Sequence, residues 1–308
     1  MILRYTYLRS HPAIFKAMTG LYVHEFDDLL SDVQPRLALA QEQRRNRPNR
    51  KRAIGAGHPF DLPHRDQILL TVVWLRRYPT REVLGYLFGV GEWTASRSIE
   101  RVLPLLEATG RDSMRMPDPG KKRRRQFDQL LAETPDLIVL IDTFEQRVQR
   151  HRDRPTADKH YSGKKKQNTL KSQIVVNEET GEICDIADSV PGPQSDIKTL
   201  EESGVMQRLP EGVGAGGDLA FVSIDKLHPQ GLGVTPRRKP RGKDRPPEDV
   251  CFNRAFSRRR IVVEHTIGRI RRYEALNQMD RDHRNHHSAR VRAVAGLVNR
   301  QLRRYSAA

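Results

Sequence analysis

The sequence predicts an α/β protein in which an all-α domain precedes a mixed domain of strands and helices. The first part of the chain carries apolar residues at helical spacing, as at Leu29 and Val33. The spacing changes at the apolar run 137–141, which is unbroken and typical of a buried central strand. Helical spacing returns after residue 248, so helices should cover the strands. The predicted parts are a helical domain at 1–110, a basic linker at 111–135 and a mixed domain at 136–308.

The composition is strongly basic, because 55 Lys and Arg residues against 38 Asp and Glu give a net charge of +17. An excess of this size favours a polyanionic partner, and double-stranded DNA is the first candidate because the basic residues cluster. An anionic membrane would attract the same charge. No apolar run is long enough to span a bilayer, however, so no membrane partner is expected.

Two features of the sequence favour a reducing compartment. Cys184 and Cys251 are the only cysteines, which is too few for a disulfide framework or a zinc ribbon. Arg4 and Arg9 interrupt the apolar residues near the start of the chain, so no secretion signal is predicted. We therefore expect the protein in the cytoplasm.

A helix-turn-helix pattern lies near the end of the first domain. Thr80 is a suitable N-cap for a short helix that ends at the turn Gly89-Val90-Gly91. A longer, polar and basic helix follows at 92–106. In DNA-binding proteins with this pattern the second helix enters the major groove. The alternative is a helical hairpin that serves only packing. The predicted DNA contacts are Thr94, Arg97 and Arg101.

Two acidic residues stand out in the second domain. Asp142 directly follows the apolar run, where a charge is costly unless it emerges at the sheet edge and meets a ligand. Glu264 lies on a stripe of a predicted helix that also carries Arg260 and Arg271. The plainer alternatives are a strand-end aspartate that caps a turn and a solvent-exposed ladder of salt bridges.

Carboxylates on rigid elements within a basic surface suit the cleavage of a phosphodiester. Two Mg²⁺ ions about 4 Å apart activate the nucleophile, stabilise the leaving oxygen and neutralise the phosphate. Neighbouring carboxylates raise one another's pKa, and bound divalent ions reverse that effect and keep them ionised. Asp142 is the residue that best fits such a site.

Four segments of the second domain form a signature. They are Ile141-Asp142-Thr143, Tyr161-Ser162-Gly163-Lys164-Lys165-Lys166, Gly217-Asp218-Leu219-Ala220-Phe221 and Arg260-Ile261-Val262-Val263-Glu264-His265-Thr266-Ile267-Gly268-Arg269. In order and spacing they resemble the corresponding segments of DDE transposases of bacterial insertion-sequence family five. The resemblance covers roughly residues 136–300, and the helix-turn-helix region resembles the N-terminal domain of the same proteins.

The resemblance implies a ribonuclease-H-like fold for the second domain, which would then be the catalytic domain. It implies that Asp142, Asp218 and Glu264 hold two Mg²⁺ ions, for which Mn²⁺ can substitute. The implied activity is DNA cleavage and strand transfer, joining the ends of an insertion sequence to target DNA. A homodimer in the active complex and a location in the bacterial cytoplasm, at the nucleoid, are implied as well.

The second acid of this triad has a rival. The family usually has an apolar strand before the second aspartate, whereas the segment 214–217, Gly-Ala-Gly-Gly, precedes Asp218. Asp225 follows the more strand-like segment 221–224. Asp218 is preferred because of its place within the resemblance.

Basic residues around these acids are predicted to contact DNA phosphates. The family has a tyrosine, an arginine and a basic residue around the glutamate, and these positions are Ser257, Arg260 and Arg271 here. The run Lys164-Lys165-Lys166 could face phosphates near Asp142, and a plain surface run is the alternative. Contacts of this kind give an affinity that is salt-sensitive and largely independent of DNA sequence.

Three other residues are given structural roles. Trp74 and Trp93 are predicted to lie in the core, and Asp196 is predicted to cap a short helix. Two other functions also fit the sequence. One is a domesticated endonuclease that no longer transposes, and the other is a DNA-binding regulator that has lost catalysis.

Overall fold

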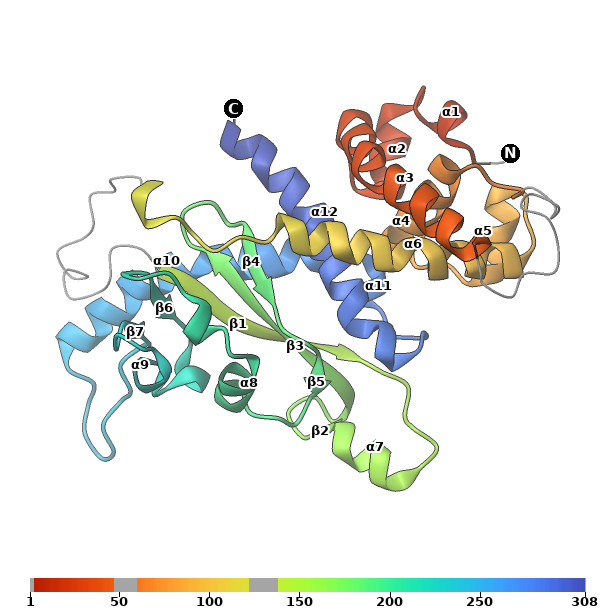
Figure 1. Cartoon of the computed structure of the whole chain (residues 1–308). Coiled ribbons are helices and arrows are strands. Elements are labelled where there is room, and N and C mark those ends of the chain that lie inside the picture. Colours follow the sequence, from red (N-terminus) through yellow and green to blue (C-terminus); the bar gives the residue numbers. More distant parts are fainter. Residues whose placement is uncertain (1–2, 47–59, 122–137, 308) are drawn as a thin grey trace. The chain divides into compact units, whose positions relative to one another are not determined.

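The computed structural model describes residues 3–46, 60–121 and 138–307, and the chain forms two compact units (Figure 1). The helical unit comprises Met1–Ser113, Arg271–Gln278 and Ala289–Gln301. The sheet unit comprises Met114–Ile270, Met279–Ser288 and Leu302–Ala308. Two segments that the sequence assigned to the mixed domain, 271–278 and 289–301, therefore cluster with the N-terminal helices. Residues 122–135, most of the predicted linker, lie outside the described residues.

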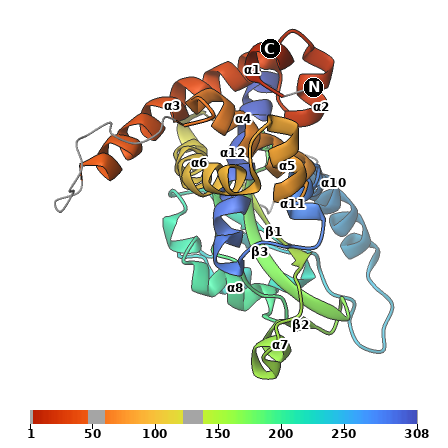
Figure 2. The same ribbon diagram turned by 90° about the vertical axis from the view of Figure 1, so that its right-hand side faces the viewer.

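The helical unit contains the helix-turn-helix that the sequence predicts, formed by α5 and α6 (Figure 2). Thr80 caps α5 by accepting a hydrogen bond from the backbone N–H of Val83 at 3.3 Å. The helix ends at Gly89, whose φ of +60° lies in the left-handed region that favours glycine. The helices of this unit are α1 (Tyr5–Leu8), α2 (Pro12–Thr19), α3 (Val23–Arg45), α4 (His64–Arg77), α5 (Arg81–Phe88), α6 (Glu92–Ser113) and α11 (Glu274–Asn277), with most of α12 (His287–Ala307).

Helices α6 and α12 approach closely at a pair of glycines, which explains why the segment 289–301 belongs to the helical unit. A Cβ on Gly110 would lie 2.4 Å from the carbonyl oxygen of Arg292. A Cβ on Gly296 would lie 2.4 Å from the Cα of Gly110. Beside this crossing, Arg292 pairs with Glu107 at 3.1 Å. Backbones this close leave no room for a larger side chain on either glycine.

Gly110→Ala is therefore expected to lower the free energy of unfolding by about 1–3 kcal/mol, because the added methyl group forces the two helices apart. Gly268→Ala is the matched control. Gly268 is also helical, and its Cβ would meet nothing within 4 Å, so alanine there should be neutral or stabilise by up to about 1 kcal/mol. Urea unfolding of both variants measures the difference. A Gly110→Ala variant as stable as the wild type would contradict the close crossing.

The sheet unit is a mixed sheet with the order β2-β3-β1-β6-β7, in which β4 and β5 also pair with β3 (Figure 1). Strand β1 is antiparallel to β3 and parallel to β6, and β6 is parallel to β7. A first strand between an antiparallel partner and two parallel strands is the ribonuclease-H-like arrangement that the resemblance implied. The elements are β1 (Ile138–Arg147), α7 (Arg154–His160), β2 (Tyr161–Ser162), β3 (Gln167–Asn177), β4 (Ile183–Ile186), β5 (Val190–Pro191), α8 (Asp196–Ser203), β6 (Gly214–Gly216), α9 (Ile224–Leu227), β7 (Gly233–Val234) and α10 (Pro247–Arg271).

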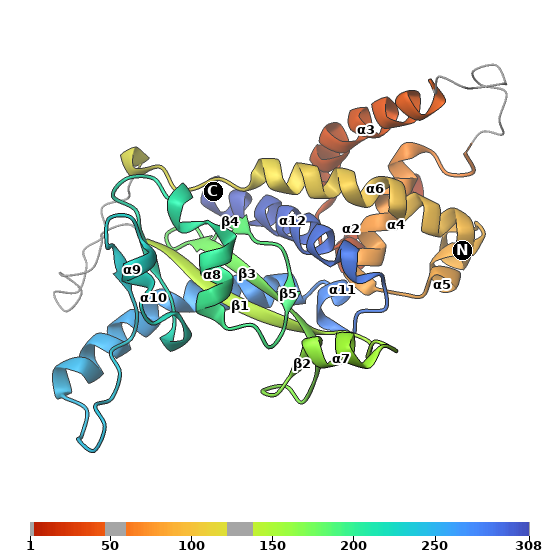
Figure 3. The ribbon, with the colours of Figure 1, turned by 60° about the horizontal axis from the view of Figure 1, so that its bottom comes forward.

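Alternate residues of β1 point to opposite faces of the sheet, and a different helix packs against each face (Figure 3). On one face, Val139 and Ile141 belong to a buried cluster that includes residues of α8. On the other face, a Cβ on Gly216 would lie 3.1 Å from Ile138 and 3.2 Å from Phe256 of α10. Even-numbered residues of β1 therefore face α10.

Strand β1 is longer than the sequence predicts. The apolar run predicts a strand at 137–141 that Asp142 directly follows, and this predicted end was wrong. The structure continues β1 to Arg147, and β3 pairs with it from Val139 to that residue. The second half of β1 stays in the sheet because Phe144 and Gln146, which point to the same face, are both buried. Asp142 therefore lies within the central strand.

A buried ion pair joins α10 to the turn between β3 and β4. The Nε and Nη2 atoms of Arg259 donate to the two carboxylate oxygens of Glu178 at 2.5 and 2.6 Å, and the two side chains are only 7 % and 4 % exposed. Further along α10, the hydroxyl of Thr266 donates to the carbonyl oxygen of Gly181 at 3.0 Å. These contacts fix α10 against the sheet.

Candidate active site

The strand register brings two of the predicted acids together. In the parallel pair of β1 and β6, Leu140 lies beside Gly216. Strand β6 ends there, and the same register continued by two residues places Asp142 beside Asp218. Among the described residues, the pairing of β1 with β6 ends at Leu140, so Asp142 lies within β1 just past the end of its parallel neighbour. Ligands of α/β sheets bind outside the carboxyl ends of strands, and Asp218 follows the carboxyl end of β6.

Asp142 is a strongly perturbed carboxylate, with only 19 % of its side chain exposed. Its pKa is raised to about 6, first by burial and to a smaller extent by the charges of Asp218 and Asp196. The backbone N–H of Thr143, which donates to Asp142 at 2.7 Å, opposes this rise, and so does the guanidinium of Arg260 at 3.7 Å. Burial is the largest cause of this raised pKa, and a bound cation would lower it by stabilising the ionised carboxylate.

A polar network beside Asp142 was missed by the sequence analysis. The ammonium of Lys171 donates to Asp196 at 2.7 Å, and the hydroxyl of Thr143 donates to the same carboxylate oxygen at 2.9 Å. Asp196 is not the helix cap that the sequence predicts, because Ser195 occupies the cap position of α8. The network holds a second carboxylate, neutralised by a buried lysine, next to Asp142.

Glu264 lies on α10 one helical turn after Arg260 and is exposed. Arg260 is nearly buried, its Nη2 atom lies 3.7 Å from Asp142, and its Nε has no hydrogen-bond partner within the described part of the chain. Among the described residues, no three His, Cys, Asp or Glu side chains lie within reach of one metal ion. Asp142 and Asp218 thus form the core of the candidate site, and the structure does not bring Glu264 together with them into one group of ligands.

Asp225, the rival of Asp218, occupies a different environment. It lies in the short helix α9 and is exposed. Its backbone packs against Gly233, where a Cβ would lie 2.3 Å from the Asp225 nitrogen. The causes that shift the pKa of Asp142 include Asp218 and not Asp225. These observations favour Asp218.

The run Lys164-Lys165-Lys166 lies away from Asp142. It forms the exposed turn between β2 and β3, and Lys166 has a left-handed φ of +52°. Ile174 is the β3 residue opposite Asp142, so the turn is eight residues further along that strand, about 26 Å at ~3.3 Å per residue. The expectation that this run lies near Asp142 was wrong, although it is free to contact DNA elsewhere. Arg271 is exposed at the end of α10.

The second helix of the helix-turn-helix presents a mixed surface. Arg97 is exposed, whereas Thr94 and Arg101 are half-buried. Trp93, in the first turn of α6, is 77 % exposed, so its predicted place in the core was wrong. Trp74 is buried as predicted. An exposed aromatic beside the predicted contacts adds a surface that could meet DNA bases.

The raised pKa of Asp142 predicts a pH-dependent stability in metal-free protein. A carboxylate whose pKa is higher when folded than when unfolded costs no stability below about pH 4, and the cost grows to its full size above about pH 6. That cost is on the order of 3 kcal/mol. Asp142→Asn removes it, so the variant should gain stability relative to the wild type as pH rises through this window. Urea unfolding in EDTA measures the trend, and a difference that stays constant with pH would contradict it.

The fold and the two aspartates define the class of ribonuclease-H-like phosphodiester nucleases. The chain belongs to the DDE superfamily of endonucleases, whose sequence profile matches residues 141–299. A second profile, the helix-turn-helix of DDE superfamily endonucleases, matches residues 60–112. These matches confirm the ribonuclease-H-like domain and the helix-turn-helix that the sequence predicts.

One relative matches over nearly its whole length. The chain is 27 % identical over 288 residues to a probable transposase for insertion sequence element IS702 of Microchaete diplosiphon, covering 94 % of each protein. No solved structure gives a significant match. Within the part of the chain that the structure describes, no helix is long and apolar enough to cross a membrane.

Proposed function

We propose that the protein is a DNA transposase that cleaves DNA at the ends of an insertion sequence and joins them to target DNA. The observation that carries the proposal is the pair Asp142 and Asp218, where β6 ends beside β1, in a chain that also has a helix-turn-helix. The net charge of +17 supports a DNA substrate. The similarity to a probable transposase supports strand transfer rather than cleavage alone.

Asp142, Asp218 and Glu264 are the residues that would hold two Mg²⁺ ions, or Mn²⁺ in their place. The fit rests on hard carboxylate oxygens and on the buried position of Asp142, whose raised pKa a bound cation would lower. Bound ions would neutralise the scissile phosphate and favour ionisation of the attacking hydroxyl. Arg260 holds Asp142 in place in the metal-free protein and is positioned to turn toward a DNA phosphate when a cation takes over that role.

The remaining contacts follow from where the basic residues lie. Thr94, Arg97 and Arg101 on α6 would contact the element ends, and the Lys164-Lys165-Lys166 turn and Arg271 would contact phosphates. Joining two ends requires two catalytic domains, so we propose a homodimer in the active complex. It would act in the bacterial cytoplasm, on DNA of the nucleoid.

The test is a cleavage and joining assay on DNA that carries the element's own ends, with Mg²⁺, with Mn²⁺ and with EDTA. Metal-dependent nicking at the ends followed by joining to a second DNA is the result expected of a transposase. Nicking without joining would indicate a non-transposing endonuclease. Binding without nicking in either metal would indicate a regulator, a result consistent with the absence of three converging metal ligands among the described residues.

A further inference from the structure

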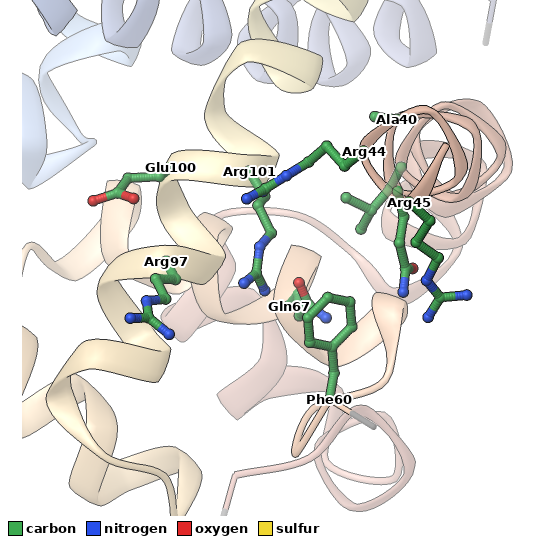
Figure 4. Close-up of a pocket in the computed structure, with 10 residues that line it drawn as sticks. Ala40, Arg44, Arg45, Phe60, Gln67, Arg97, Glu100 and Arg101 are labelled. Atoms are coloured by element: carbon green, nitrogen blue, oxygen red, sulfur yellow. The ribbon is translucent and has the colours of Figure 1, made fainter. Parts of the chain in front are cut away.

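The helical unit contains a pocket that shares Arg97 and Arg101 with the predicted DNA contacts of the helix-turn-helix. It has a volume of about 770 Å³ and lies between the C-terminal half of α3, the start of α4 and the middle of α6 (Figure 4). Pockets of this size hold small organic groups. The residues that give it its character are Arg44, Arg45, Phe60, Gln67, Arg97 and Arg101.

The charge of the pocket suits an anion. Four arginines line it, and Glu100 is the only acidic residue in its described lining. Among the described residues, Arg44, Arg97 and Arg101 form no salt bridge with a carboxylate. Burial lowers the pKa of Arg101, and the charges of Arg44 and Arg97 lower it further. These guanidinium groups therefore repel one another until an anion joins them.

The oxygen of a buried side-chain amide in the same pocket accepts no hydrogen bond from the described residues. Gln67 is 1 % exposed, and its Oε1 atom has no hydrogen-bond partner among the residues that the structure describes. Its Nε2 atom donates to the carbonyl oxygen of Leu62 at 2.8 Å, which fixes the amide so that the oxygen remains as the acceptor. A buried acceptor without a partner costs free energy unless a ligand supplies the donor. The pocket is therefore complementary to a ligand that carries an N–H donor as well as a negative charge.

An aromatic ring forms one wall. Phe60 is 43 % exposed, and the guanidinium of Arg101 lies 4.3 Å from the centre of its ring. Phe60 also lines a second cavity of about 410 Å³, beside His64 and Arg65. A large ring that stands between two cavities offers area for a flat partner.

We propose that this pocket holds one unpaired nucleotide of a DNA strand, with the base against Phe60, an exocyclic amine donating to Gln67, and phosphates on the arginines. The inference rests on the proposed function for its choice of DNA as the ligand. Bases in a duplex are stacked and their amines are paired, so only an unpaired nucleotide offers a free face, a free amine and a phosphate together. The site would capture a frayed or extruded nucleotide near the DNA that α6 contacts.

The test measures how tightly the full-length protein binds a fluorescent oligodeoxyadenylate of about eight nucleotides, within the usual range for single-strand sites. The comparison probes are the same DNA as a duplex and an abasic strand of equal length. Phe60→Ala should weaken binding of the single strand about 5- to 150-fold and leave duplex binding nearly unchanged. Leu39→Ala is the control, because Leu39 is an exposed apolar residue of α3 that does not line the pocket.

Three outcomes would overturn the inference. Equal binding of the adenylate and abasic strands would show a site for phosphate only. Equal losses in the Phe60→Ala and Leu39→Ala variants would show no role for the ring. A loss of duplex binding as large as that of the single strand would assign Phe60 to duplex recognition. These results are independent of the nicking assay, so a protein that never cleaves DNA could still confirm the pocket.

Discussion

Asp142→Ala is expected to abolish metal-dependent DNA cleavage while leaving DNA binding intact. The buried position of this carboxylate beside Asp218 makes it the centre of the proposed metal site. Metal ions stabilise the transition state for phosphoryl transfer by several kcal/mol, so losing the central ligand should slow nicking by at least ~10³-fold. Single-turnover nicking of end-containing DNA, at protein concentrations that saturate binding, separates the chemical step from affinity.

The two candidate second acids provide the matched comparison for this experiment. Asp218→Ala should lose cleavage as Asp142→Ala does. Asp225→Ala should retain it, because Asp225 is exposed on α9 and does not influence the pKa of Asp142. The opposite ranking would assign the second metal ligand to Asp225. If Asp142→Ala retained full cleavage activity, the proposal that Asp142 and Asp218 form the catalytic site would be contradicted.

The central strand and its acid were predictable because burial leaves a strong pattern. The run 137–141 is unbroken and apolar, as expected of a strand covered on both faces, and a single carboxylate follows it. The end of the strand was not predictable. The polar residues from Thr143 to Arg147 remain paired with β3, a contact that depends on chain far away in sequence. Local patterns do not report such pairing.

The residues around Asp142 could not be predicted from local sequence patterns either. Strand β6 is only Gly214–Gly216, which has no strand pattern of its own, so the register that brings Asp218 beside Asp142 is visible only in the fold. The pair of Lys171 and Asp196 likewise joins two elements distant in sequence. Glu264 was predicted from its helical stripe and from the family resemblance, and its role stays a prediction. Its exposed position on α10, and not its identity, is what the structure adds.

Glu178→Ala is expected to destabilise the sheet unit more than any other single change at an ion pair in it. The substitution leaves Arg259 buried without its carboxylate, and breaking a buried pair in this way costs about 3–5 kcal/mol. Glu182→Ala is the matched control. Glu182 pairs with Arg303 across the surface of the same unit, with side chains 28 % and 45 % exposed, and such a pair contributes only about 0–1 kcal/mol.

Urea unfolding of the two variants compares these costs directly, and a third variant identifies their origin. Replacing both partners, as Glu178→Leu with Arg259→Met, removes both buried charges and should recover most of the lost stability. If Glu178→Ala were no more damaging than Glu182→Ala, the pair would not hold α10 on the sheet. Because α10 carries both Arg260 and Glu264, loosening it should also weaken metal-dependent cleavage at temperatures where the protein remains folded.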